Sequence, residues 1–219
     1  MTMTQARIFI VDDHPLVREW LTNLIQQHPD LIVCGEAEDS PTALRAIAEI
    51  APDLAIIDLS LGGGSGIDLI RSIRSLSPNV ATIVLSMHDE RIYAERSIRA
   101  GARGYIMKRE STKKIVEAIR EVLQGNMYLS KDLTALFAKK FVAGPASAPD
   151  GLPIAQLSDR ELQVFRLIGE GYEPREIAGT LNVNIKTVHT YCTRIKEKLK
   201  FTTGAELVRE AIRWGAEQF

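Results

Sequence analysis

The stretch Arg7-Ile-Phe-Ile-Val-Asp-Asp13 decides the fold, because a short apolar run ends there in two adjacent carboxylates. Four more short apolar runs follow at intervals that leave room for a helix between consecutive runs. Together the five runs span residues 7–12, 31–37, 54–58, 80–86 and 104–107. Short apolar runs rich in β-branched residues are typical of strands that are buried on both faces of a parallel sheet.

Apolar stripes at helical spacing lie between these runs and after the last one. They are Leu16, Trp20 and Leu24; Ala43, Ile47 and Ile50; Leu69, Ile70, Ile73 and Leu76, before Pro78; and Ile115, Val116, Ile119 and Val122, within a helix over 112–123. Strands that alternate with helices predict βαβ units. We therefore expect an α/β fold, a (βα)5 domain with a doubly wound five-stranded parallel sheet that ends at Gly125.

Polar residues close four of the five runs. Asp12 and Asp13 follow the first, Asp58 ends the third, Ser86 ends the fourth and Lys108 follows the fifth. The carboxyl ends of parallel strands form the ligand crevice of such a sheet, so these side chains should converge there. Carboxylates suit Mg²⁺, and Asp58 could attack a phosphoryl group whose oxygens Lys108 and Ser86 contact. Taken singly, an aspartate at the end of a strand could also be a helix cap or a surface charge, and Lys108 could be an ordinary loop lysine.

A second, helical domain is expected after a linker. Residues 131–141 have helical spacing, and residues 143–153 are small, Pro-rich and nearly uncharged, as linkers are. Ser158 and Glu161 then form a capping-box pattern at the start of a helix. Further helices are expected from Pro174, over 186–199 and over 205–214, with a tight turn at 182–184. Two helices joined by a short turn, the second one basic, predict a helix-turn-helix within an all-α four-helix domain.

The basic helix has one apolar face and one polar face. Burial of Val188, Cys192, Ile195 and Leu199 would fix its rotation, because these residues share a face. The remaining faces would then expose the candidate DNA contacts Lys186, His189, Thr190, Thr193, Lys196 and Lys200. The lysines would bind phosphates and the smaller side chains could meet base edges. Viewed alone, the segment is more typical of a solvated amphipathic helix with a cluster of charges.

At this point the sequence resembles a known family. Val11-Asp-Asp-His-Pro-Leu-Val-Arg18, Leu85-Ser-Met-His-Asp89 and Gly101-Ala-Arg-Gly-Tyr-Ile-Met-Lys108 resemble the receiver domain of two-component response regulators. The run from Leu157-Ser-Asp-Arg-Glu-Leu to Lys198-Leu-Lys200 resembles the helix-turn-helix of the NarL/FixJ (LuxR-type) subgroup. The resemblance implies a receiver domain over 1–125, a linker with one helix over 126–153 and a DNA-binding domain over 154–219.

The resemblance also implies roles for single residues. Asp58 would accept a phosphoryl group from a histidine kinase or a small phosphodonor, and Lys108 would bind the phosphoryl oxygens. Ser86 and Tyr105 would form a switch pair, in which the hydroxyl moves toward the phosphoryl group and the ring turns inward. The implied Mg²⁺ ligands are Asp13, Asp12 largely through water, Asp58 and the backbone carbonyl of Ser60. Phosphorylation would promote a homodimer that binds double-stranded DNA, and His189, Thr190 and Thr193 match the DNA-reading positions.

The chain departs from the family pattern at two places. Gly62 stands where a proline is usual, although Gly66 matches an expected glycine, and a glycine run should loosen the loop of the metal-ligating carbonyl. Ser60 and His88 hold the two positions that modulate dephosphorylation in the family; His88 could orient water or be a solvated loop histidine. Tyr191 replaces a histidine that is common in the subgroup.

The composition limits the remaining choices. The sequence has neither a long apolar span nor a secretory signal pattern, which favours a cytoplasmic protein without membrane contact. Cys34 and Cys192 lack metal or disulfide spacing and are expected to be small core residues. A phosphohydrolase would use a second Asp two residues after Asp58, but residue 60 is serine, so we expect a regulator and not an enzyme. The alternative is a phosphorylation-independent DNA-binding regulator with a degenerate receiver.

Overall fold

The computed structural model describes residues 5–61, 64–143 and 153–216, apart from the side chains of 140–143. The chain divides into two compact units, Met1–Ala138 and Lys139–Phe219, and the division falls inside helix α6 (Lys131–Ala143). Each unit is described by itself. Most of the Pro-rich stretch 143–153 within the expected linker, namely residues 144–152, lies outside the described residues.

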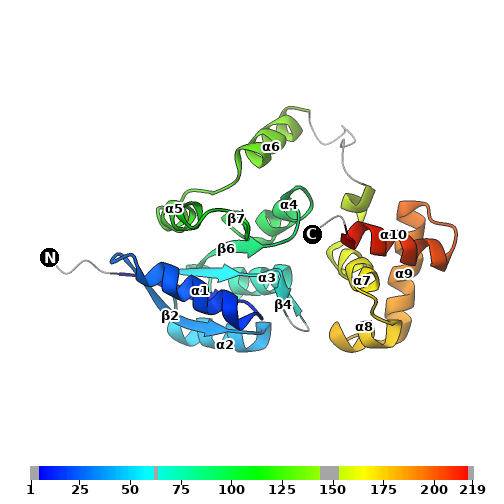
Figure 1. The fold of residues 1–219 in the computed structure, drawn as a ribbon, viewed down its shortest axis with the longest axis horizontal. Coiled ribbons are helices and arrows are strands. Elements are labelled where there is room, and N and C mark those ends of the chain that lie inside the picture. Colours follow the sequence, from blue (N-terminus) through cyan, green and yellow to red (C-terminus); the bar gives the residue numbers. More distant parts are fainter. Residues whose placement is uncertain (1–4, 62–63, 144–152, 217–219) are drawn as a thin grey trace. The chain divides into compact units, whose positions relative to one another are not determined.

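The first unit contains the predicted five-stranded parallel sheet (Figure 1). Its strand order is β2 (Leu31–Ala37), β1 (Ala6–Val11), β3 (Leu54–Ile57), β6 (Ala81–Ser86) and β7 (Gly104–Met107). Every neighbouring pair is parallel, and the chain winds outward in both directions from β1 and β3. The doubly wound fold is therefore confirmed, and its ligand crevice is expected at the carboxyl ends of β1 and β3.

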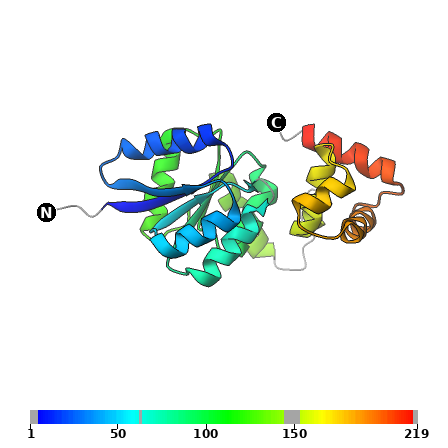
Figure 2. The same cartoon turned by 90° about the horizontal axis from the view of Figure 1, so that it is seen from below.

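Helices cover both faces of this sheet (Figures 1 and 2). On one face α1 (Pro15–Gln26) and α5 (Thr112–Leu123) pack with the strands into a single apolar cluster. On the other face α2 (Ser40–Ile50), α3 (Gly66–Leu76) and α4 (Glu90–Ala100) lie side by side. Ile115, Val116, Ile119 and Val122 are all buried, as their spacing predicts.

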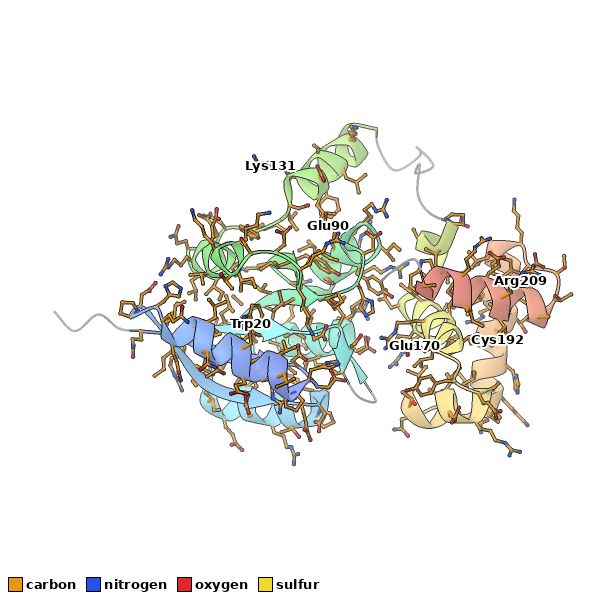
Figure 3. All side chains as sticks on the ribbon, viewed as in Figure 1. Trp20, Glu90, Lys131, Glu170, Cys192 and Arg209 are labelled. Carbon is orange, nitrogen blue, oxygen red and sulfur yellow. The ribbon has the colours of Figure 1, made fainter. Side chains whose placement is uncertain are left out.

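Two predicted stripes are partly wrong. Leu16 is 79% exposed and Trp20 is 36% exposed, because α1 turns Leu21, Leu24 and Ile25 toward the sheet instead. Trp20 is labelled on α1 in Figure 3. Leu76 is 71% exposed, since it is the last residue of α3 and lies beyond the edge of the core. A stripe read at strict four-residue steps drifts off the buried face, which recurs on average every 3.6 residues.

A two-stranded hairpin that the sequence does not predict lies after β3. β4 (Ser60–Leu61) pairs in antiparallel fashion with β5 (Gly64–Ser65), while the intervening residues 62–63, and with them Gly62, lie outside the described residues. The expected glycine at position 66 has a steric reason: a Cβ there would lie 2.2 Å from the Asp58 carbonyl oxygen. Only glycine lets the chain pass so close to Asp58.

The second unit is helical. A short 3-10 turn (Pro153–Gln156) precedes α7 (Asp159–Gly169), α8 (Pro174–Thr180), α9 (Ile185–Leu199) and α10 (Gly204–Ala216). The predicted capping box is present, since the Ser158 hydroxyl and the Glu161 carboxylate each accept a backbone N–H of the other residue. The four-helix domain with a helix-turn-helix formed by α8 and α9 is therefore confirmed.

The two cysteines lie one in each unit and are half-buried. Burial raises the pKa of both the Cys34 and the Cys192 thiol, so the neutral thiol is favoured. Both residues pack as the sequence predicts, but less completely. None of the helices within 5–61, 64–143 and 153–216 is long and apolar enough to cross a bilayer.

Candidate functional site

The strand-end residues meet in one pocket of the first unit. The Lys108 ammonium lies 2.7 Å from an oxygen of Asp12 and 2.7 Å from an oxygen of Asp58. Asp12 follows β1, Asp58 follows β3 and Lys108 follows β7, so three strand ends contribute to this contact. Asp12 and Asp58 are 2% and 4% exposed, and the Lys108 side chain is 11% exposed. The pocket therefore holds two carboxylates around one ammonium, largely out of water.

Burial controls the ionisation of these groups. It raises the pKa of Asp58, because desolvation outweighs the attraction of Lys108 and the nearby Asp12 acts in the same direction as burial. Burial also acts to lower the pKa of Lys108, but attraction to Asp58 and Asp12 is stronger and the net pKa is raised. Lys108 thus stays protonated, and further positive charge near the carboxylates would be stabilised.

The donor atoms around the pocket fit a divalent cation. Ligand atoms of Asp12, Asp13, His14 and Asp58 all lie within 4.8 Å of one another. Asp13 Oδ1 is buried and accepts no hydrogen bond from the described residues, although His14 Nδ1 is 2.7 Å away. Carboxylate oxygens with room for water are the ligands that Mg²⁺ prefers. The backbone of Ser60 hydrogen-bonds to the Asp58 carboxylate, so this residue also borders the pocket.

His88 joins the other expected site residues. Its backbone N–H donates to the Ser86 hydroxyl at 3.3 Å, and its carbonyl accepts the Tyr105 hydroxyl at 2.8 Å. Its ring nitrogen Nε2 lies 2.7 Å from the Ser60 hydroxyl, and its ring stacks on Tyr93 with centroids 4.7 Å apart. Both ring and backbone are therefore engaged, so the solvated-loop interpretation of His88 is wrong.

The switch-pair candidates lie behind the pocket. Ser86 is fully buried and Tyr105 is 1% exposed, with its ring turned into the protein. Burial raises the pKa of Tyr105 well above its ordinary value, so its hydroxyl stays protonated and remains a donor to His88.

Two further pocket residues were not singled out from the sequence. His14 follows the Asp-Asp pair directly, and Arg18 one turn later donates to the Asp12 carbonyl at 2.7 Å.

In the second unit α9 presents the candidate DNA contacts. Val188 and Ile195 are fully buried, while Cys192 and Leu199 are half-buried, so the predicted rotation of the helix is correct. Lys196 is partly exposed, and the other candidates are exposed: Lys186, His189, Thr190, Thr193 and Lys200. The hydroxyls of Thr190 and Thr193 donate to carbonyls one turn back, which leaves their oxygen lone pairs and methyl groups for a ligand.

One lysine of α9 has an internal partner. Lys198 lies 2.6 Å from a carboxylate oxygen of Glu161, and Glu161 is 3% exposed. Burial acts to raise the pKa of Glu161, but Lys198 and the groups of Ser158 lower it by more, so the net pKa lies below the ordinary range. Lys198 therefore holds α9 against α7, and it is not a free cation of the recognition surface.

An acidic strand-end pocket and a helix-turn-helix in one chain define a regulator that reads a chemical signal and binds DNA. The family models agree: residues 8–120 match the response regulator receiver domain, and residues 155–211 match the bacterial regulatory proteins of the luxR family. The chain therefore belongs to the two-component response regulators of the NarL/FixJ type and is a DNA-binding regulator.

Its relatives are similar along nearly the whole chain. The oxygen regulatory protein NreC of Staphylococcus carnosus is 33% identical over 210 residues, covering 94% of this chain and 97% of NreC. The response regulator GacA of Pseudomonas aeruginosa is 31% identical, covering 95% and 96%. A structure of RcsB from Salmonella enterica bound to promoter rprA with the phosphomimetic BeF3⁻ is 26% identical, covers 94% and 98%, and has a TM-score of 0.69.

Proposed function

We propose that this protein is a transcription regulator gated by phosphorylation of Asp58. One observation carries the proposal: a single, largely buried ammonium, Lys108, lies 2.7 Å from both Asp12 and Asp58. The pocket thus has a candidate nucleophile, a fixed cation and, in Asp13, a further carboxylate within 4.8 Å of the others. On this basis we assign the receiver to 1–125, the linker to 126–153 and the DNA-binding domain to 154–219.

Asp58 would act as the nucleophile of the phosphoryl transfer. One of its oxygens attacks phosphorus, and the bond from phosphorus to a histidine nitrogen of the partner kinase breaks. Lys108 already contacts Asp58 and would move with the new negative charge onto the phosphoryl oxygens. The Ser86 hydroxyl, which now accepts the His88 N–H, would turn toward the same oxygens. Tyr105 would stay inward and hold the His88 carbonyl.

A bound Mg²⁺ would supply positive charge to the transferring phosphoryl group and orient its oxygens. Asp13 and Asp58 would ligate it directly, Asp12 largely through water, and Ser60 through its carbonyl. Both oxygens of Asp12 already have partners, because one contacts Lys108 and the other accepts the His14 N–H, whereas Asp13 has such a contact, with His14, at one oxygen only. We therefore infer that the affinity for Mg²⁺ depends more on Asp13 than on Asp12.

The output would be DNA binding by α9 in a homodimer. Lys186, Lys196 and Lys200 would contact phosphates, and His189, Thr190 and Thr193 would face base edges. One helix offers few cations, so a dimer that doubles the contacts is needed for specific affinity. RcsB supports both steps by analogy, since its structures include promoter complexes formed with a phosphomimetic and two dimers bound to two DNAs.

The test is the intact mass of purified protein after incubation with Mg²⁺ and acetyl phosphate, with Asp58→Ala as the matched control. We expect one phosphoryl adduct on the wild type only, and light scattering on the same sample should shift toward a dimer. Duplexes recovered from a random library by the phosphorylated protein then report DNA binding. A wild type that takes up neither acetyl phosphate nor beryllofluoride, yet binds these duplexes tightly, would support the phosphorylation-independent alternative instead.

A further inference from the structure

The chain after α5 attaches to the edge of the sheet at the candidate switch residue. The Tyr105 backbone N–H donates to the Tyr128 carbonyl at 3.1 Å, and the Tyr128 N–H donates to the Arg103 carbonyl at 2.9 Å. Tyr128 thereby forms a parallel bridge with Gly104 beside β7. Tyr105 is thus bonded twice: its backbone holds the segment that leads to α6, and its side chain holds His88 in the loop before α4.

A second contact joins the same two segments. The Ser130 hydroxyl donates to a carboxylate oxygen of Glu90, the first residue of α4, at 3.0 Å. The same hydroxyl accepts the Leu133 N–H at 3.1 Å, as an N-cap residue does, and Leu133 is 1% exposed. Figure 3 labels Glu90 and Lys131, which mark the starts of α4 and α6. The cap of α6 is therefore bonded to the start of α4.

These contacts close a ring. The Tyr105 hydroxyl is bonded to the His88 carbonyl, and one residue of chain separates His88 from Glu90. Glu90 is bonded to Ser130, and one residue separates Ser130 from Tyr128, whose carbonyl is bonded to the Tyr105 backbone N–H. The Ser86 hydroxyl accepts the His88 N–H, so the ring borders the phosphoacceptor pocket. α6 begins at this ring and is the element in which the first unit ends.

We propose that Glu90 and Ser130 carry the state of the phosphoacceptor pocket to α6, which rests on the function proposed above. The ring is closed when the Tyr105 side chain is buried, and the phosphoryl-bound pocket favours that position. The ring is already closed in this structure, and when Ser86 turns to the phosphoryl group the Tyr105 side chain is held buried, so the contact between Glu90 and Ser130 opens less often. Phosphorylation then stabilises the first turn of α6. This turn has two states, ordered and frayed, and the phosphoryl group and the Glu90–Ser130 contact both favour the ordered one.

Hydrogen exchange of α6 in the full-length protein tests the proposal. Amides 132–138 are compared with and without Mg²⁺ and beryllofluoride, and fluorine NMR measures beryllofluoride binding on the same samples. In the wild type we expect exchange about 5-fold slower with beryllofluoride, the lower end of ordinary allosteric coupling. Exposed Lys131 provides the matched control, and Lys131→Ala should keep the full effect.

Two variants open the ring without removing the cap. Ser130→Asp keeps an N-cap residue as effective as serine but sets a carboxylate against Glu90, and Glu90→Ala removes the acceptor. Each should bind beryllofluoride like the wild type but lose the slowing of exchange. The double variant Ser130→Asp, Glu90→Lys restores an attractive pair and should recover the slowing, which a general loss of folding could not produce.

The outcomes separate the two proposals. A wild type that does not bind beryllofluoride contradicts the proposed phosphorylation and this inference with it. A wild type that binds beryllofluoride with unchanged exchange of 132–138 contradicts the inference alone. Full slowing in both Ser130→Asp and Glu90→Ala also contradicts it, as does a double variant that stays uncoupled. Loss in the single variants with recovery in the double one establishes the Glu90–Ser130 contact as the link.

Discussion

The acidic strand-end pocket and helix α9 are built from the sequence in opposite ways. The pocket collects Asp12, Asp58 and Lys108 from three strand ends that are far apart in sequence, and it buries both carboxylates and most of the lysine side chain. The candidate DNA contacts, by contrast, come from α9 and its C-cap Lys200, one continuous stretch of chain, and most of them are exposed. The positions of the pocket residues thus depend on the whole sheet, whereas a surface residue of α9 can be substituted without a change in the fold.

Charges should differ in strength between the two regions for the same reason. The ammonium of Lys108 has two carboxylate partners at 2.7 Å in a largely dry pocket, where Coulomb attraction is only weakly screened. Lys186 and Lys200 project into water, where salt screens their fields within about 10 Å. A single substitution in the pocket should therefore change phosphorylation strongly, whereas one on α9 should change DNA affinity by a small amount.

Lys108→Ala should give the largest effect. It leaves Asp12 and Asp58 buried without their cation and removes the positive charge from the phosphoryl oxygens. The rate of phosphorylation by acetyl phosphate should fall by about 100- to 1,000-fold, the usual cost of one preorganised electrostatic group. The measurement is adduct formation over time by intact mass. Lys108→Arg keeps the charge and should retain more activity; equal rates for both variants would contradict a role for the fixed cation.

Two glycines offer a matched pair, one in each unit. A Cβ at Gly66 would lie 2.2 Å from the Asp58 carbonyl oxygen, and one at Gly169 would lie 2.4 Å from the Ala211 carbonyl oxygen. The backbone must shift in both cases, at a cost of about 3 kcal/mol. Gly66→Ala should reduce phosphoryl uptake and Gly169→Ala should reduce DNA affinity, with little effect of either on the other activity. Urea unfolding measures the loss of stability, and intact mass and DNA binding measure the two activities. A loss of DNA affinity in Gly66→Ala and of phosphoryl uptake in Gly169→Ala would contradict the prediction.

The sequence predicts the pocket better than the contacts around it. Asp12, Asp58, Ser86 and Lys108 are found because strand periodicity places each at a carboxyl end, and topology then brings those ends together. The Ser60–His88 contact joins the β4–β5 hairpin to the loop after β6 and is encoded in no local pattern, so it could not be predicted without coordinates. The rotation of α1 could have been predicted, because its buried residues Leu21, Leu24 and Ile25 stand at helical spacing, which a stripe read at four-residue steps missed.

The Glu161–Lys198 pair is a second contact that no local pattern encodes, and its removal should have a medium effect on stability. Glu161→Gln keeps both capping hydrogen bonds but loses the charge that faces Lys198, which should lower the free energy of unfolding by about 1.5 kcal/mol. The pKa of Glu161 is lowered in the fold from its ordinary 4.5. Its contribution is therefore present above pH 4.5 and is lost as pH falls through the lower folded value.

The two tryptophans allow the contribution of Glu161 to the stability of the second unit to be measured in the intact chain. Trp20 lies in the first unit and Trp214 in the second, where its ring is 5.8 Å from that of Phe165. In a Trp20→Phe background, fluorescence during urea unfolding reports on the second unit alone. The difference in stability between the chain that keeps Glu161 and the Glu161→Gln variant should shrink as pH falls below 4.5. A difference that is constant with pH would show that packing, and not charge, is responsible.

Lys196→Ala should have the smallest effect, and Lys198→Ala is its matched control on the same helix. Lys196 is partly exposed, forms no ion pair within the described part of the chain and is a candidate phosphate contact, whereas Lys198 is bonded to Glu161. Lys196→Ala should weaken binding to all duplexes about equally and reduce the salt slope of log affinity by about 1, with unfolding unchanged. Lys198→Ala should lower stability and leave the salt slope nearly intact. If both variants change the slope alike, Lys198 leaves Glu161 for the DNA, and the recognition surface is broader than the free protein presents.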